Sequence, residues 1–151
     1  MSLSYQKFLK TLPNEVISLL PAPLQGIKVR QPWRWLVQFH YGEPRLHYEV
    51  SRAQGKMGLE LGFHCEARDR DLNRYLLNGF RHNLFEIKDT LGERFEAEMW
   101  DKGWTKIYEI YPQGDLTEDY RTQVGTRLSE IIVCLHPIYA ELRGQVARIY
   151  R

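Results

Sequence analysis

The sequence predicts an α+β fold: a five-stranded, mainly antiparallel sheet with helices packed against it, in the order α-β-β-β-α-β-β-α. Apolar and polar residues alternate in five short stretches, and three other segments show the three-and-four spacing of helices with one buried face. Short turns join neighbouring stretches, which favours antiparallel pairing because a parallel pair needs a long crossover. With 151 residues, 43% of them hydrophobic, we expect one domain, residues 1–151.

The first predicted helix covers residues 4–20. A helical stripe of apolar residues runs from Tyr5 to Leu12, and Ser4 precedes it as a suitable N-cap. Proline disfavours helical geometry at the residue before it. We therefore expect Pro13 to break the helix, with Asn14 capping a second short turn.

Three predicted strands follow the helix. The first covers residues 27–41 and is interrupted near Pro32, because proline cannot donate to a sheet ladder. The second covers residues 46–51 and the third residues 57–65, each entered through a turn that contains glycine. These three strands are expected to form a meander.

The second half of the chain is predicted to add a helix, a hairpin and a final helix. The helix begins at Asp69 or Asp71 and ends at Gly92. The hairpin pairs residues 95–99 with 104–110. The final helix begins after Thr117, and Pro137 is expected to kink it.

Composition excludes several classes of protein. The 6 Phe, 4 Trp and 9 Tyr are too many for an intrinsically disordered chain. No apolar run approaches the ~20 residues that a membrane-spanning helix needs, and the first ten residues do not resemble a signal peptide. Cys65 and Cys134 cannot by themselves form a disulfide framework or a four-ligand zinc site, and both are interpreted as structural. We expect a cytoplasmic protein with no membrane contact.

Charge is distributed unevenly along the chain. The overall charge is +2, yet residues 86–119 hold 10 acids and 4 bases. A nucleic-acid-associated module is one alternative, because basic side chains beside aromatic ones can contact phosphates and stack on bases. However, alternation places Trp33 and Trp35 on the opposite strand face from Arg34, which favours core tryptophans and solvated cations. The residues of this alternative are Lys28, Arg30, Arg34, Arg70, Arg74 and Arg81.

Carboxylates also alternate along the predicted strands, with His47 and His64 among them. Whether Glu49, Glu60, Glu66, Glu96 and Glu98 converge depends on the pairing of the strands, which the sequence does not determine. Converging acids and a histidine bind divalent metals or perform acid–base chemistry. A metal-dependent hydrolase using Glu49, Glu60, His64 and Glu96 is therefore a second alternative. A solvated acidic face is the favoured interpretation, and no catalytic, cofactor-binding or metal-binding residue is assigned.

The favoured function is non-enzymatic binding of a protein partner or of a second copy of the chain. No phosphate-binding glycine loop, serine elbow or zinc motif is present. Trp100 and Trp104 flank the polar turn at residues 101–103, and aromatic side chains rimmed by charge are typical of protein interfaces. The candidate contact residues are Trp33, Trp100, Trp104 and Tyr108. No cofactor is expected.

The order of the elements resembles the type III secretion chaperone-like fold. The apolar stripes at Phe8 and Leu12, at residues 59–63, at residues 72–80, at residues 97–99 and at residues 128–135 carry this resemblance over most of the chain. It implies a small, dimeric, non-catalytic protein that binds extended segments of other proteins. The net charge of +2 departs from the acidic balance of such chaperones.

A second resemblance is local. Residues 96–107, EAEMWDKGWTKI, follow a long amphipathic helix and resemble the end of an uncharacterised bacterial domain that is sometimes attached to nuclease-like proteins. This likeness covers about fifty residues of the chain. It implies no activity by itself.

Overall fold

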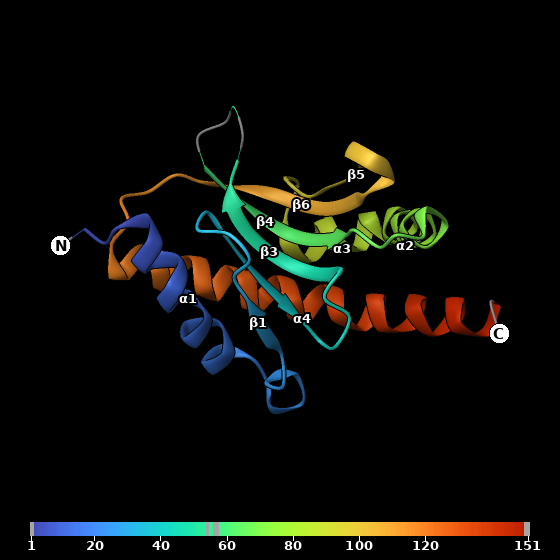
Figure 1. Ribbon diagram of the computed structural model, residues 1–151, viewed down its shortest axis with the longest axis horizontal. Helices are drawn as coiled ribbons and strands as arrows, with labels where there is room; N and C mark the ends of the chain where they lie inside the picture. Colours follow the sequence, from blue (N-terminus) through green and yellow to red (C-terminus); the bar gives the residue numbers. More distant parts are fainter. Residues whose placement is uncertain (1, 54, 56–57, 150–151) are drawn as a thin grey trace.

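The computed structural model describes residues 2–53, 55 and 58–149, and within them six strands form one antiparallel sheet in the order β1-β2-β3-β4-β6-β5 (Figure 1). The α+β class and the antiparallel sheet predicted from the sequence are confirmed, but the predicted count of five strands is wrong. The strands are β1 (Lys28–Arg30), β2 (Leu36–His40), β3 (Leu46–Arg52), β4 (Gly58–Cys65), β5 (Glu96–Met99) and β6 (Thr105–Pro112).

The extra strand comes from the segment predicted as one strand over residues 27–41. This segment forms β1 and β2, which pair with each other and are separated by a non-strand loop at residues 31–35. Pro32 lies in that loop, where its missing N–H breaks no ladder. The expectation that Trp33 and Trp35 are core residues is wrong, because their side chains are 58% and 55% exposed.

The strands β2, β3 and β4 form the predicted meander, and β5 pairs with β6 as the predicted hairpin. The hairpin joins the meander through β6, which pairs with β4. The register places Tyr48, Phe63 and Ile107 opposite one another on one face. On the other face it places His47, His64 and Lys106 opposite one another.

Helices α1 (Tyr5–Leu19) and α4 (Glu118–Ile149) both contain a proline that does not end them. The expected break at Pro13 is wrong, and α4 continues as one helix through Pro137, where a kink was expected. An interior proline costs a helix about 3 kcal/mol. In α1, buried apolar residues on both sides of Pro13 offset this cost by packing against the core. The N-caps Ser4 and Thr117 are confirmed.

The predicted long helix over residues 71–91 is two helices, α2 (Arg70–His82) and α3 (Leu84–Leu91). Asp69 caps α2 by accepting hydrogen bonds from the backbone of Asp71 and Leu72. Asn83 separates the two helices, and its side-chain amide donates a hydrogen bond to the Gly79 carbonyl at 2.8 Å. Asparagine side chains compete in this way for the carbonyls that would continue a helix.

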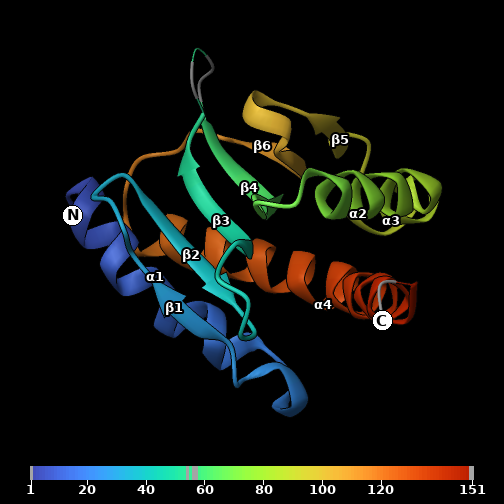
Figure 2. The ribbon, with the colours of Figure 1, turned by 45° about the vertical axis from the view of Figure 1, so that its right-hand side comes forward.

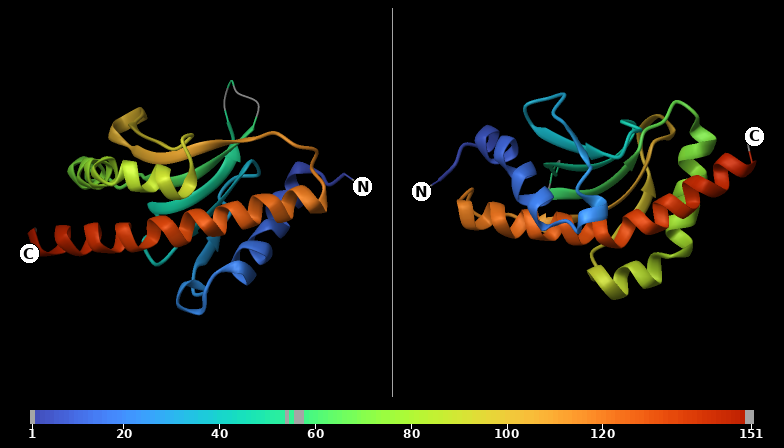
Figure 3. Two further views of the ribbon diagram at one scale, coloured as in Figure 1. Left: turned by 180° about the vertical axis from the view of Figure 1, so that it is seen from behind. Right: turned by 90° about the horizontal axis from the view of Figure 1, so that it is seen from below.

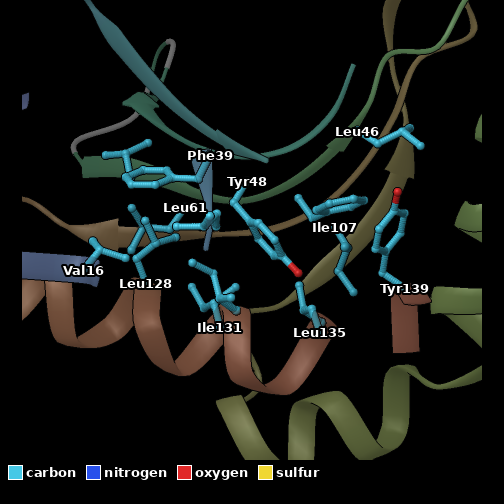
Figure 4. Packing of buried hydrophobic residues seen from close by; sticks show 14 of the residues in the cluster. Val16, Phe39, Leu46, Tyr48, Leu61, Ile107, Leu128, Ile131, Leu135 and Tyr139 are labelled. Carbon is cyan, nitrogen blue, oxygen red and sulfur yellow. The ribbon is translucent and has the colours of Figure 1, made fainter. Parts of the chain in front are cut away.

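The helices α1 and α4 pack on one face of the sheet, and α2 lies beside its β6–β5 end (Figures 2 and 3). Figure 4 shows Leu128, Ile131 and Leu135 of α4 against Tyr48 and Leu61 of the strands. The opposite sheet face carries the polar side chains of the alternating pattern. Two short 3-10 turns, Ala22–Leu24 and Asp101–Gly103, connect α1 to β1 and β5 to β6. None of the helices in the described part of the chain has the length and apolar character needed to cross a membrane.

Candidate functional site

A stacked pair of exposed tryptophans lies in the loop between β1 and β2. The rings of Trp33 and Trp35 lie 5.5 Å apart with an angle of 7° between their planes. The loop that carries them follows β1 directly and is held to α1 by a hydrogen bond from the Tyr5 hydroxyl to the Trp35 carbonyl (2.9 Å). The loop and the first half of α1 line a groove of about 1000 Å³.

The groove, which we call the aromatic groove, is basic. Lys7, Lys10 and Arg34 line it together with the two tryptophans, and none of the described residues in its wall is a carboxylate. The expectation that Arg34 and the tryptophans face opposite ways is wrong, because residues 31–35 are not in a strand. The full wall is Ser4, Gln6, Lys7, Lys10, Thr11, Gln31, Pro32, Trp33, Arg34 and Trp35.

The strand β1 forms one edge of the sheet next to this loop. Among the described residues it pairs only with β2, and its three side chains are exposed. An edge strand presents unpaired backbone groups that a further strand can bind. Val29 places an apolar side chain, 43% exposed, on this edge.

The other predicted contact residues lie elsewhere. Trp100, Trp104 and Tyr108 gather at the β5–β6 end of the sheet, where the two tryptophan rings meet edge to face at 5.2 Å. Trp100 and Trp104 are half-buried, and Tyr108 is buried with its hydroxyl donating to Glu98 at 2.8 Å. Of the four predicted contact residues, only Trp33 lines the aromatic groove.

The cations of the nucleic-acid alternative do not form one surface. Arg34 lies in the groove, and Lys28 and Arg30 lie on the exposed edge strand. In contrast, Arg70, Arg74 and Arg81 belong to α2, whose contacts are with α4, β5 and β6. The predicted set is therefore divided between two parts of the molecule.

A second site, the polar pocket, lies on the sheet face opposite α4. It has a volume of about 430 Å³, and Glu49, Glu60 and His64 line it together with Trp100 and Lys106. Three of the five strand carboxylates, Glu49, Glu60 and Glu66, converge here on His47 and His64. The interpretation of these three as a solvated acidic face is wrong, because all are buried or half-buried.

The remaining two carboxylates are placed differently. Glu98 lines the pocket but accepts its hydrogen bond from Tyr108, and Glu96 is exposed. Glu96 therefore does not join the group expected for a metal-dependent hydrolase. His47 and Glu66 take part in the convergence instead, since the β3–β4 register places His47 beside His64.

His64 is the centre of the polar pocket. Its Nε2 lies 2.9 Å from Glu60 Oε2 and its Nδ1 lies 3.0 Å from Glu66 Oε2, while Glu49 Oε2 is 3.8 Å from Nε2. Burial lowers the pKa of His64, but the charge of Glu49 and the hydrogen bonds to Glu60 and Glu66 outweigh it and raise this pKa to about 10. His64 is consequently an imidazolium that donates from both nitrogens.

The neighbouring positive charges lower the pKa values of Glu49 and Glu60. Burial raises the pKa of Glu49, but the His64 charge and the hydrogen bond from His47 dominate and lower it to about 2. The pKa of Glu60 is also lowered, against its burial, by His64 and by Lys106, whose Nζ lies 2.6 Å from Glu60 Oε1. Both carboxylates are therefore ionised at neutral pH.

The two cysteines are placed as predicted. Cys65 is buried in the core, on the sheet face opposite His64, and burial raises the pKa of its thiol to about 12. Cys134 is half-buried on α4, and burial also raises its pKa. Neither thiol is poised to act as a nucleophile.

Comparison with known proteins gives one similarity. No protein-family model matches the chain, and no solved structure matches it significantly. The chain is similar to Clathrin interactor 1 of Mus musculus, with 25% identity over 111 residues, which are 72% of this chain. The aligned part is 15% of that curated protein, so the chain spans only a small fraction of its length.

Proposed function

We propose that this chain is a non-enzymatic, chaperone-like binding module that holds an extended, acidic segment of a partner protein in the aromatic groove. The observation that carries this proposal is the stack of Trp33 and Trp35, both more than half exposed. Tryptophan is enriched among residues that dominate binding energy, because burying its large ring against a partner removes much apolar surface from water. A stacked pair supplies such an anchor without any rearrangement.

The charge of the groove supports an acidic segment. Lys7, Lys10 and Arg34 are exposed in its wall. Opposite charges across an interface accelerate association and reject partners of the wrong sign. A segment rich in Glu or Asp satisfies these three cations.

The edge strand supports a protein partner over a nucleic acid. An extended peptide can add to β1 through backbone hydrogen bonds while its side chains reach the groove beside it. A nucleic acid has no such ladder of donors and acceptors. The similarity to Clathrin interactor 1, whose name states an interaction with another protein, supports the same choice.

The proposal includes a homodimer that uses a separate surface. Phe85 on α3 is 87% exposed and lies outside the groove. Size-exclusion chromatography with light scattering measures the mass. We expect the mass of two chains for the natural sequence and of one chain for Phe85→Ala, and a monomer in both samples contradicts the homodimer.

Titration with synthetic probes tests the proposed partner. The probes are a short peptide alternating Glu with Leu, the same peptide with Lys in place of Glu, and an oligothymidylate. We expect the acidic peptide to bind, and a Trp33→Ala/Trp35→Ala double variant to weaken it by at least about tenfold, equivalent to ~1.4 kcal/mol. Val133→Ala is the control, because it shortens an exposed apolar side chain on α4 outside the groove and should leave the affinity unchanged.

Two outcomes of this titration contradict the proposal. Oligothymidylate binding that is stronger than peptide binding and is lost in the double variant would support the nucleic-acid alternative. Absence of binding by all three probes would remove the groove as a recognition site. Circular dichroism of each variant checks that the fold is intact.

A further inference from the structure

Four side chains in and beside the polar pocket have the composition and spacing of a metal site. His47, Glu49, His64 and Glu66 each offer one ligand atom, and these atoms all lie within 4.8 Å of one another. A divalent metal with bonds of about 2.0–2.2 Å needs its ligand atoms about 3–4 Å apart. A contraction of less than about one ångström therefore brings this group into coordination range.

The hydrogen bonding of His47 independently favours positive charge at this position, from a proton or a metal ion. Its Nδ1 lies 2.8 Å from the Pro44 carbonyl, which can only accept, so Nδ1 carries a proton and donates. In the neutral ring Nε2 then presents a lone pair, yet Glu49 Oε1 lies 3.2 Å away and Glu66 Oε1 3.9 Å away. Two acceptors therefore face one nitrogen of a ring that is 1% exposed. A second proton on the ring satisfies Glu49 alone, whereas a metal ion bound to Nε2 would satisfy both carboxylates.

The charge balance of the polar pocket and the side chains beside it is compatible with a bound divalent ion. Glu49, Glu60 and Glu66 bring three negative charges, and Lys106 balances one of them through Glu60. The remaining two charges are matched either by protons on both imidazoles or by one divalent cation bound to neutral imidazoles. The two states carry the same net charge, so metal binding imposes no new unpaired charge on the pocket.

Neighbouring residues form hydrogen bonds that orient the side chains of this cluster, as the residues around the ligands of a metal site do. Gln38 Nε2 donates to Glu49 Oε1 at 3.0 Å, and the Pro44 carbonyl orients the His47 ring. Glu60, fixed by Lys106, accepts from Nε2 of His64 and leaves Nδ1 of that ring on the side of Glu66. Such second contacts fix the tautomer and direction of a ligating histidine.

We propose that His47, Glu49, His64 and Glu66 together bind one divalent transition-metal ion. Two imidazole nitrogens and two carboxylate oxygens are a donor set for Zn²⁺ and its neighbours, whereas Mg²⁺ and Ca²⁺ prefer oxygen donors throughout. The site belongs to the sheet and does not depend on the function of the aromatic groove. The half-buried Trp100, edge-on to His64 at 5.9 Å, forms one wall beside the ion.

Calorimetric titration of the full chain, freed of metal by a chelator, tests this site. We expect Zn²⁺ to bind with one ion per chain and to raise the melting temperature, and Mg²⁺ at the same concentration to do neither. Glu49→Gln and Glu66→Gln each keep the shape of the side chain but remove a ligand charge, and each should weaken Zn²⁺ binding by more than tenfold. Glu60→Gln, which alters only an outer partner, should cost about 10–100-fold.

Two matched controls address adventitious binding. Glu98→Gln changes a carboxylate in the wall of the same pocket, and His82→Gln removes an exposed imidazole on α2. Both should leave the affinity for Zn²⁺ unchanged. Binding that survives in Glu49→Gln and Glu66→Gln, or that disappears in His82→Gln, overturns the proposal.

A measurement on the unmodified chain covers the case in which a buried substitution prevents folding. Ring ¹⁵N spectra of histidine report directly on each imidazole nitrogen. Zn²⁺ should shift one nitrogen in each of two histidines, His47 and His64, and leave the other three rings unaffected. A titration in which neither ring responds, or in which only exposed rings respond, rejects the site.

Discussion

At the scale of single residues, the helix-facing side of the sheet also contains a buried charge pair. Glu109 on β6 is fully buried, and Arg127 on α4 contacts it with two nitrogens, Nε at 2.6 Å and Nη2 at 2.9 Å. Arg127 also donates to the Leu91 carbonyl at the end of α3. One guanidinium thus joins a strand and two helices, and the pair of parallel hydrogen bonds fixes its orientation.

Removing one partner of this pair should be far more costly than removing both. Arg127→Met leaves the buried Glu109 carboxylate with only the exposed Arg94 as a counter-charge, 3.5 Å away. It also removes both short hydrogen bonds to Glu109, and we expect a loss of about 3 kcal/mol in the free energy of unfolding. Glu109→Leu/Arg127→Met should recover most of that loss. Urea unfolding of both variants measures the difference, and a double variant no more stable than the single one would contradict this reasoning.

The raised pKa of His64 predicts how stability depends on pH. A histidine with pKa about 10 in the folded protein and about 6.5 in the unfolded chain binds its proton more tightly when folded. Its contribution is therefore complete below pH 6.5 and is lost as the pH rises toward 10. In chelator-treated protein, the free energy of unfolding should decrease as the pH rises through this window. In His64→Gln this decrease should be smaller, because the contribution of His64 is absent. An identical pH dependence in the variant would contradict the assignment, with His82→Gln as the exposed control.

Glu49 predicts the opposite dependence at acidic pH. Its pKa is lowered to about 2 in the folded protein, so the folded state binds this proton less tightly than the unfolded chain. The stabilisation is present above about pH 4.5 and is lost as the pH falls toward 2. Acid unfolding followed by circular dichroism should be less steep in Glu49→Gln. A variant with the unchanged acid profile would show that this carboxylate is not held ionised.

At the scale of elements, local rules predicted the existence and type of helices and strands better than their ends. Alternation covered the residues of every strand, but it merged β1 and β2 because it could not show that residues 31–35 leave the sheet between them. Pro13 was expected to end a helix and does not, because apolar contacts on both sides of it outweigh one lost hydrogen bond. Asn83 ends α2 through a side-chain bond to a carbonyl, which spacing alone does not reveal.

The contact between β4 and β6 gives a prediction at this scale. A Cβ on Gly62 would clash with the backbone carbonyl oxygen of Ile107, whereas a Cβ on Gly79 would meet only the end of the Leu142 side chain. The backbone of Ile107 is fixed in the sheet and cannot shift as the flexible Leu142 side chain can. We expect Gly62→Ala to destabilise by about 1–3 kcal/mol and Gly79→Ala by clearly less. Thermal unfolding of the two variants provides the comparison, and equal losses would contradict a rigid β4–β6 contact.

At the scale of the whole molecule, the candidate sites depend on contacts between distant segments. Alternation placed His47, Glu49, Glu60 and His64 on strand faces, but only the β3–β4 register brings them to one point. The aromatic groove needs residues 31–35 and the first half of α1 to lie together, and no motif encodes that contact. The sequence therefore predicts the residue types of both sites, and tertiary structure determines which residues belong to each.

The two sites should act independently, although one residue touches both. Trp35 lines the aromatic groove and also the polar pocket, but the four proposed metal ligands lie on or next to β3 and β4. Distant sites without shared partners have additive energies. Trp33→Ala should therefore weaken binding of the acidic peptide and leave the affinity for Zn²⁺ unchanged. Glu66→Gln should weaken Zn²⁺ binding and leave the affinity for the peptide unchanged. Titrating peptide with and without saturating Zn²⁺ measures any coupling. If Zn²⁺ changes the affinity for the peptide, bound peptide must change the affinity for Zn²⁺ by the same factor. Trp35, which lines both sites, would then be the residue to substitute next.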